Sequence, residues 1–258
     1  RRVGDGFVHM RYVNDGRLRR GRCQALGRDG NGFGHERFSK LISMMRRDFI
    51  VLATLAIVGM AYAGTQPGKN GSAKGSVILV VGDSLSAEYG LARGTGWVTL
   101  LEQRLAQEKI PATVVNASVS GDTTAGGRAR LAALLKLHQP THVVLELGSN
   151  DALRGLPLAN TQDNLDWMTE QDQAAGARVL LVGMQMPPNY GADYGRRFAS
   201  LFEAVAKERK AALVPFLLKG VADAPNPTAL FQPDRIHPRS EAQPRMLDNV
   251  WPELRKLL

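Results

Sequence analysis

Short apolar runs alternate with longer amphipathic segments over residues 76–258. Runs of Val, Ile and Leu predict buried strands of a parallel sheet, and the segments with apolar positions at helical spacing predict helices. No internal repeat interrupts this alternation, so it indicates one α/β domain with helices on both faces of the sheet. The predicted strands are Val77–Val81, Ala112–Asn116, His142–Leu147, Arg178–Met184 and Ala212–Phe216, and the predicted helices are Gly96–Gln107, Ala125–Leu137, Leu158–Ala175, Tyr194–Lys210 and Ala242–Leu257.

The N-terminal part of the chain follows a different pattern. In MMRRDFIVLATLAIVGMAYAG, residues 44–64, two arginines precede a 13-residue apolar run and a small-residue Ala-Tyr-Ala site. This order predicts a signal peptide over residues 44–63, cleaved near Ala63 and Gly64, and export to the periplasm or the medium. The run is shorter than the roughly 18 apolar residues of a spanning helix, so we expect no stable membrane anchor. The paired arginines leave the Sec and twin-arginine routes both open.

Two further segments flank the predicted signal peptide. Residues 1–43 are rich in Gly and Arg and have no periodicity, so we expect a non-native extension or a disordered basic arm. Residues 64–75 read as a polar linker. Cys23, the one cysteine, lies in the extension, so we expect neither a disulfide nor a thiolate metal site in the exported chain.

The positive charge of the chain is confined to its start. Residues 1–47 carry 12 Lys and Arg against 4 Asp and Glu, and they account for eight of the nine formal net positive charges. A nucleic-acid-binding domain would show its basic residues on one face or along one element. The nearly neutral remainder therefore predicts no nucleic-acid partner.

Polar motifs follow three of the predicted strands and precede the last helix. They are Gly-Asp-Ser around Ser84, SVSGDTT around Gly121, GSND around Asn150, and DRIHP with Asp234 and His237. The carboxyl ends of parallel strands share one edge of the sheet, where α/β proteins bind their ligands, so we expect these motifs to meet there.

Together the motifs contain the parts of a serine hydrolase. Ser84 offers a hydroxyl nucleophile, His237 a base and Asp234 a carboxylate to orient it. The Ser84 and Gly121 backbone N–H groups and the Asn150 side chain offer an oxyanion hole. Each of these residues, taken alone, is more commonly found as a helix cap, a turn residue or a solvated loop residue. Their conjunction at one sheet edge favours catalysis.

The same four blocks resemble those of the GDSL or SGNH hydrolase family, and the resemblance covers residues 76–258. Among its members the chain looks most like bacterial arylesterases similar to the multifunctional thioesterase and lysophospholipase. The resemblance implies a flavodoxin-like three-layer α/β/α sandwich with a five-stranded parallel sheet. It also implies hydrolysis of a small-molecule ester or thioester through an acyl-enzyme on Ser84, with no metal or organic cofactor.

The acyl group needs an apolar groove beside the serine. Leu153, Leu156, Met186, Pro187 and Tyr190 follow the third and fourth strands and are our candidates for its lining. Two alternatives remain open, a carbohydrate O-deacetylase of the same fold and a non-catalytic flavodoxin-like binding protein. The sequence leaves the oligomeric state open.

Overall fold

The computed structural model describes residues 75–258, so the predicted signal peptide and the extension before it lie outside the described residues. Five strands form one parallel sheet in the order β2-β1-β3-β4-β5. They are β1 (Ser76–Gly82), β2 (Ala112–Asn116), β3 (His142–Glu146), β4 (Arg178–Val182) and β5 (Ala212–Val214). This order reverses direction between β1 and β3, which is the flavodoxin-like arrangement.

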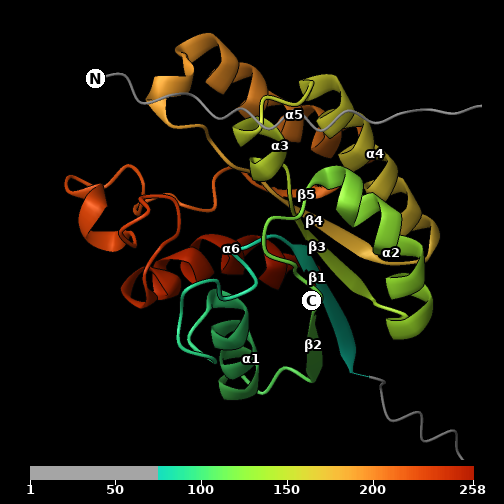
Figure 1. The fold of residues 1–258 in the computed structure, drawn as a ribbon. Helices are drawn as coiled ribbons and strands as arrows, with labels where there is room; N and C mark the ends of the chain where they lie inside the picture. Colours follow the sequence, from blue (N-terminus) through green and yellow to red (C-terminus); the bar gives the residue numbers. More distant parts are fainter. Residues whose placement is uncertain (1–74) are drawn as a thin grey trace, which may run out of the picture. The chain divides into compact units, whose positions relative to one another are not determined.

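Helices cover both faces of the sheet (Figure 1). One face is covered by α1 (Trp97–Gln107) and α6 (Gln243–Leu257), and the other by α2 (Thr124–His138), α4 (Leu158–Ala174) and α5 (Ala192–Arg209). A five-residue helix, α3 (Ser149–Leu153), and three 3-10 turns, Pro188–Tyr190, Pro227–Leu230 and Ser240–Ala242, lie between the longer elements. The three-layer α/β/α fold implied by the family resemblance is confirmed.

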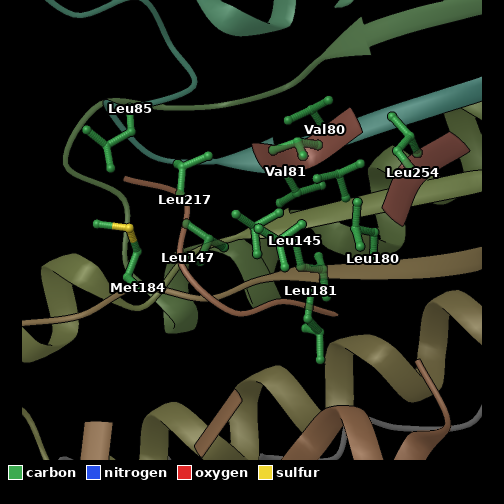
Figure 2. Packing of buried hydrophobic residues seen from close by; sticks show 14 of the residues in the cluster. Val80, Val81, Leu85, Leu145, Leu147, Leu180, Leu181, Met184, Leu217 and Leu254 are labelled. Atoms are coloured by element: carbon green, nitrogen blue, oxygen red, sulfur yellow. The ribbon is translucent and has the colours of Figure 1, made fainter. Parts of the chain in front are cut away.

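The core explains why the apolar runs became strands. All five residues of β3 are buried, as are the last five of β1, because helices pack on both sides of them. Figure 2 shows part of this cluster, in which side chains of the central strands pack with Leu254 of α6 and with Leu85, Met184 and Leu217 beyond the strand ends. The packed sheet gives the loops at its carboxyl edge a rigid base.

Helix ends are fixed by specific contacts. The Thr123 side chain accepts a hydrogen bond from the Gly126 N–H and caps α2. The start of α1 is held from outside the helix, since the Trp97 N–H donates to the Gln243 side chain at 3.0 Å. None of the helices within residues 75–258 is long and apolar enough to cross a bilayer.

Candidate active site

Ser84 lies in the turn that follows β1, two residues beyond the end of the strand. The Ser86 and Ala87 N–H groups donate to the Asp83 carbonyl at 3.2 and 3.0 Å, so the backbone turns sharply around Ser84. A Cβ on Gly82 would lie within 3 Å of the Ser86 and Glu146 side chains, so the close packing under this turn requires glycine. Ser84 itself is half-buried.

His237 connects Ser84 with Asp234. Its Nε2 lies 2.8 Å from Ser84 Oγ, and its Nδ1 lies 2.7 Å from Asp234 Oδ2. A carboxylate only accepts hydrogen bonds, so Nδ1 carries the proton and Nε2 is left with a lone pair toward the Ser84 hydroxyl. This geometry can take a proton from Ser84.

Asp234 is held in its ionised form by its own loop. Its Oδ1 accepts hydrogen bonds from the Ile236 and His237 N–H groups at 2.9 and 3.1 Å. Partial burial opposes ionisation, but these hydrogen bonds and the one with the His237 ring lower the pKa of Asp234 to about 2. The carboxylate is therefore charged at neutral pH and can stabilise a protonated His237.

Tyr89 and Gln232 hold the His237 loop against the Ser84 loop. The Tyr89 ring packs on the His237 ring with centroids 4.3 Å apart. The Gln232 side chain donates to the Tyr89 carbonyl at 2.9 Å and to the Pro238 carbonyl at 3.2 Å, and the Gln232 N–H donates to the His237 carbonyl at 2.8 Å. These contacts fix the imidazole relative to the serine, and the sequence analysis identified neither residue.

The predicted oxyanion-hole residues lie on α3 and on the loop after β2. Asn150 is the second residue of α3, and its Nδ2 donates to Asp83 Oδ2 at 3.1 Å. Gly121 has a φ of 78°, which favours glycine, and its carbonyl accepts a hydrogen bond from Arg154 Nη2 at 2.8 Å. Its loop is tied to β1 because the Val119 N–H donates to the Gly82 carbonyl at 3.0 Å.

A pair of buried carboxyl groups lies under the nucleophile. Glu146, at the end of β3, is fully buried; its Oε2 accepts the Ser86 hydroxyl at 2.7 Å, and its Oε1 has no partner among the described residues. Burial raises the pKa of Asp83 to about 6, against the opposing effect of the Leu85 N–H, which donates to its Oδ1 at 3.0 Å. Burial, together with the Asp83 charge, raises the pKa of Glu146 well above its usual value. Burial and mutual repulsion therefore both disfavour a second negative charge on this pair.

A cavity of about 600 Å³ opens beside the serine. Asp83, Ser84, Asn150 and His237 lie at its polar end, whereas Gly121 is not among its lining residues. Its apolar lining comes from α3 and from the segments after β1, β4 and β5, namely Leu85, Leu153, Met184, Met186, Pro187, Pro188, Phe216, Leu218, Ala222, Phe231 and Ile236.

The candidate acyl-groove residues divide between two places. Leu153, Met186 and Pro187 line this cavity. Leu156 and Tyr190 are not among its lining residues and are each 39% exposed. Within residues 75–258, no group of three or more His, Cys, Asp or Glu side chains is placed to hold a metal ion.

Known proteins match this fold and these motifs. The GDSL-like Lipase/Acylhydrolase family matches residues 80–243. Esterase TesA of Pseudomonas aeruginosa is 53% identical over 186 residues, which cover 72% of this chain and 91% of that protein. Thioesterase 1/protease 1/lysophospholipase L1 of Escherichia coli K12 is 40% identical over 187 residues, covering 72% of this chain and 87% of that protein.

A solved structure agrees with these relatives. The psychrotrophic esterase EstA of a Pseudoalteromonas species, inhibited by monoethylphosphonate, superposes with a TM-score of 0.66 at 40% identity and covers 70% of this chain and 97% of its own. These similarities set aside the non-catalytic binding protein. The chain belongs to the GDSL-like lipase and acylhydrolase family, the SGNH hydrolases, and is a serine ester hydrolase.

Proposed function

We propose that the protein hydrolyses esters and thioesters with apolar acyl groups through a covalent acyl-enzyme on Ser84. The observation that carries this proposal is the continuous hydrogen-bonded line Asp234–His237–Ser84, with contacts of 2.7 and 2.8 Å. Such a line activates a serine that is otherwise a weak nucleophile at neutral pH.

The reaction has two halves. His237 Nε2 takes the Ser84 proton while Oγ attacks the ester carbonyl, and the carbonyl oxygen becomes an oxyanion next to the Ser84 and Gly121 N–H groups and the Asn150 amide. The tetrahedral intermediate collapses, the imidazolium gives its proton to the leaving alcohol or thiol, and the acyl group stays on Ser84. Water, deprotonated by His237, then attacks the acyl-enzyme, and Ser84 regains its proton as the carboxylic acid leaves.

The cavity supports acyl groups longer than acetyl. Most of its lining side chains are apolar, mainly Leu, Met, Pro and Phe, although Gln185, Asp223, Thr228 and Arg235 also line it. The apolar side chains stabilise hydrocarbon and offer no hydrogen bonds to a sugar. Each methylene that moves from water into such a site contributes about 0.8 kcal/mol, close to a fourfold gain in kcat/KM. Aryl esters, acyl thioesters and lysophospholipids share this apolar acyl or aryl part. A carbohydrate O-deacetylase binds only an acetyl group and would gain little binding energy from this apolar lining.

A series of p-nitrophenyl esters from acetate to laurate tests the proposal. We expect kcat/KM to rise from acetate to a medium-chain optimum, and Ser84→Ala to abolish turnover and acyl-enzyme formation. Ser200→Ala is the matched control, because this hydroxyl lies on α5 and its one hydrogen bond within residues 75–258 goes to the Arg197 carbonyl. A folded Ser84→Ala protein with full activity would overturn the nucleophile, and an optimum at acetate would favour the deacetylase.

Export through the segment at residues 44–63 belongs to the same proposal. A basic pair, an apolar run and a small-residue cleavage site support it. N-terminal sequencing of the protein from a periplasmic or culture fraction should begin at Gly64, and a cell-associated protein with residues 44–63 intact would contradict it.

A further inference from the structure

The large apolar side chains that remain exposed are concentrated at one edge of the sheet. Among the described residues they are Tyr89, Val119, Leu137, Leu156, Tyr190 and Ile236, each between 39% and 74% exposed. All except Leu137 lie in the segments that leave the carboxyl ends of the strands or in the His237 loop. Single exposed apolar residues are normally scattered over a surface, so five at one edge need an explanation.

We call Tyr89, Val119, Leu156, Tyr190 and Ile236 the apolar rim. Tyr89 packs on the His237 ring, and Ile236 is the neighbour of His237 and lines the cavity. The Leu156 N–H donates a hydrogen bond to the Asp151 carbonyl. Asp151 adjoins Asn150 on α3.

The other two members lie beside the site as well. Val119 is hydrogen-bonded to the end of β1 through the Gly82 carbonyl, and Tyr190 follows Pro187 and Pro188, which line the cavity. Direct contacts or sequence neighbours thus connect every member of the apolar rim to the candidate active site.

The same segments carry exposed arginines. Arg93, Arg154, Arg235 and Arg239 are exposed, and none of them forms an ion pair within residues 75–258. Guanidinium groups and apolar side chains on one surface are the combination that binds an anionic lipid interface.

Most carboxylates of these segments are already engaged. Glu88 accepts the Gly94 and Gly96 N–H groups, Asp122 pairs with Arg130, and Asp234 holds His237. Asp223, Asp234 and Glu241 are exposed carboxylates of these segments, three against the four arginines, and Asp223 also accepts the Gly220 N–H. The exposed arginines thus outnumber the exposed carboxylates by one, and this small positive excess favours an anionic surface over a cationic one.

We infer that the apolar rim docks the enzyme on an anionic lipid surface, with the mouth of the cavity facing the lipid. This inference extends the proposed function, because an acyl substrate held in the lipid would enter the cavity without crossing water. The docking is peripheral and reversible, since it uses side chains on loops and no inserted helix.

Vesicle binding by the inactive Ser84→Ala protein tests the inference without turnover. We expect co-sedimentation with vesicles of phosphatidylcholine and phosphatidylglycerol, and at least fivefold weaker partitioning onto phosphatidylcholine alone. Raising NaCl from 0.1 to 0.5 M should weaken binding, because salt screens the arginines.

A matched pair of variants separates binding through the apolar rim from non-specific binding through any exposed apolar side chain. In the Ser84→Ala background, Leu156→Ser combined with Tyr190→Ser should lower partitioning at least tenfold. Leu137→Ser, which removes the more exposed leucine in the last turn of α2 at the opposite edge of the sheet, should change it less than twofold. If the double variant does not fold, Leu156→Ser alone should lower partitioning about threefold or more.

The outcomes distinguish this inference from the proposed function. The docking surface would be overturned if the protein did not bind anionic vesicles, or if the rim and Leu137→Ser variants lost partitioning equally. In the first case the apolar rim would be better explained as a site for a protein partner. Hydrolysis of soluble p-nitrophenyl butyrate without vesicles would still stand as the separate test of the active site.

Discussion

Replacing Asp83 by Asn should impair the oxyanion hole while the triad stays intact. Asp83 Oδ2 accepts the Asn150 amide at 3.1 Å, and Oδ1 accepts the Leu85 N–H at 3.0 Å. An asparagine at this position has one acceptor oxygen and one NH2 group. If its oxygen keeps the Leu85 hydrogen bond, its NH2 faces the NH2 of Asn150, and two donors cannot bond.

The contact at stake sets the size of the effect. A hydrogen bond to a charged acceptor contributes about 1.5–3 kcal/mol, which corresponds to a loss of about 10- to 150-fold in kcat if all of it orients Asn150 in the transition state. Complete loss of an oxyanion-hole donor costs about 10²–10³, so Asn150→Ala gives the upper limit. KM should change little, because an oxyanion-hole donor bonds the oxyanion more strongly than the ground-state ester carbonyl.

A double-mutant cycle decides whether Asp83 acts through Asn150. We would measure kcat and KM on p-nitrophenyl butyrate for the wild type, Asp83→Asn, Asn150→Ala and the double variant, with thermal melts to show that each is folded. If Asp83 positions Asn150, adding Asp83→Asn to Asn150→Ala should change kcat by less than about twofold. Effects that multiply would refute this reasoning and assign Asp83 another role.

Two further substitutions test the charges of the structure. Asp234→Asn should lower kcat by about 10²–10⁴-fold, because His237 loses the carboxylate that fixes its tautomer. Burst kinetics should show slowed acylation. An unchanged kcat would mean that another group orients the ring. Burial raises the pKa of Asp172 on α4 to about 8. Between about pH 4 and 8 the folded state therefore holds a proton that the unfolded state releases. The free energy of unfolding should fall as pH rises through this range, by at most about 1.4 kcal/mol per pH unit. Asp172→Asn should flatten this slope between pH 5 and 8 in thermal melts, and an unchanged slope would contradict the buried acid.

The periodic elements could be predicted well because the core dictates them. The β2 limits Ala112–Asn116 were predicted as the structure has them, while β5 ends at Val214 instead of Phe216. Pro215 follows β5 and has no N–H to continue the ladder. The α3 helix, Ser149–Leu153, is not among the predicted helices, because five residues are too few for a helical period to show.

The site was predictable where a motif marks a strand end, and less so elsewhere. Ser84, Asn150 and His237 line one cavity as expected from their places after the strands and before α6. Glu146 was missed because it was read as part of an apolar strand.

Loop residues were harder to assign. The role of Gln232 depends on how the His237 loop folds back on itself, which no local pattern encodes. For the same reason, a position after a strand did not show that Leu156 and Tyr190 would lie outside the cavity lining.

Ser84 and His237 are 153 residues apart in the chain, and they meet only when α6 and its preceding loop have joined the sheet. A partly synthesised chain that ends before residue 237 therefore lacks the imidazole that contacts Ser84. We expect hydrolysis to begin only when the segment after β5 has packed against the sheet, so the unfolded chain should be inactive in the compartment where it is made. The same separation makes turnover a sensitive refolding assay, because each active molecule must have completed its fold.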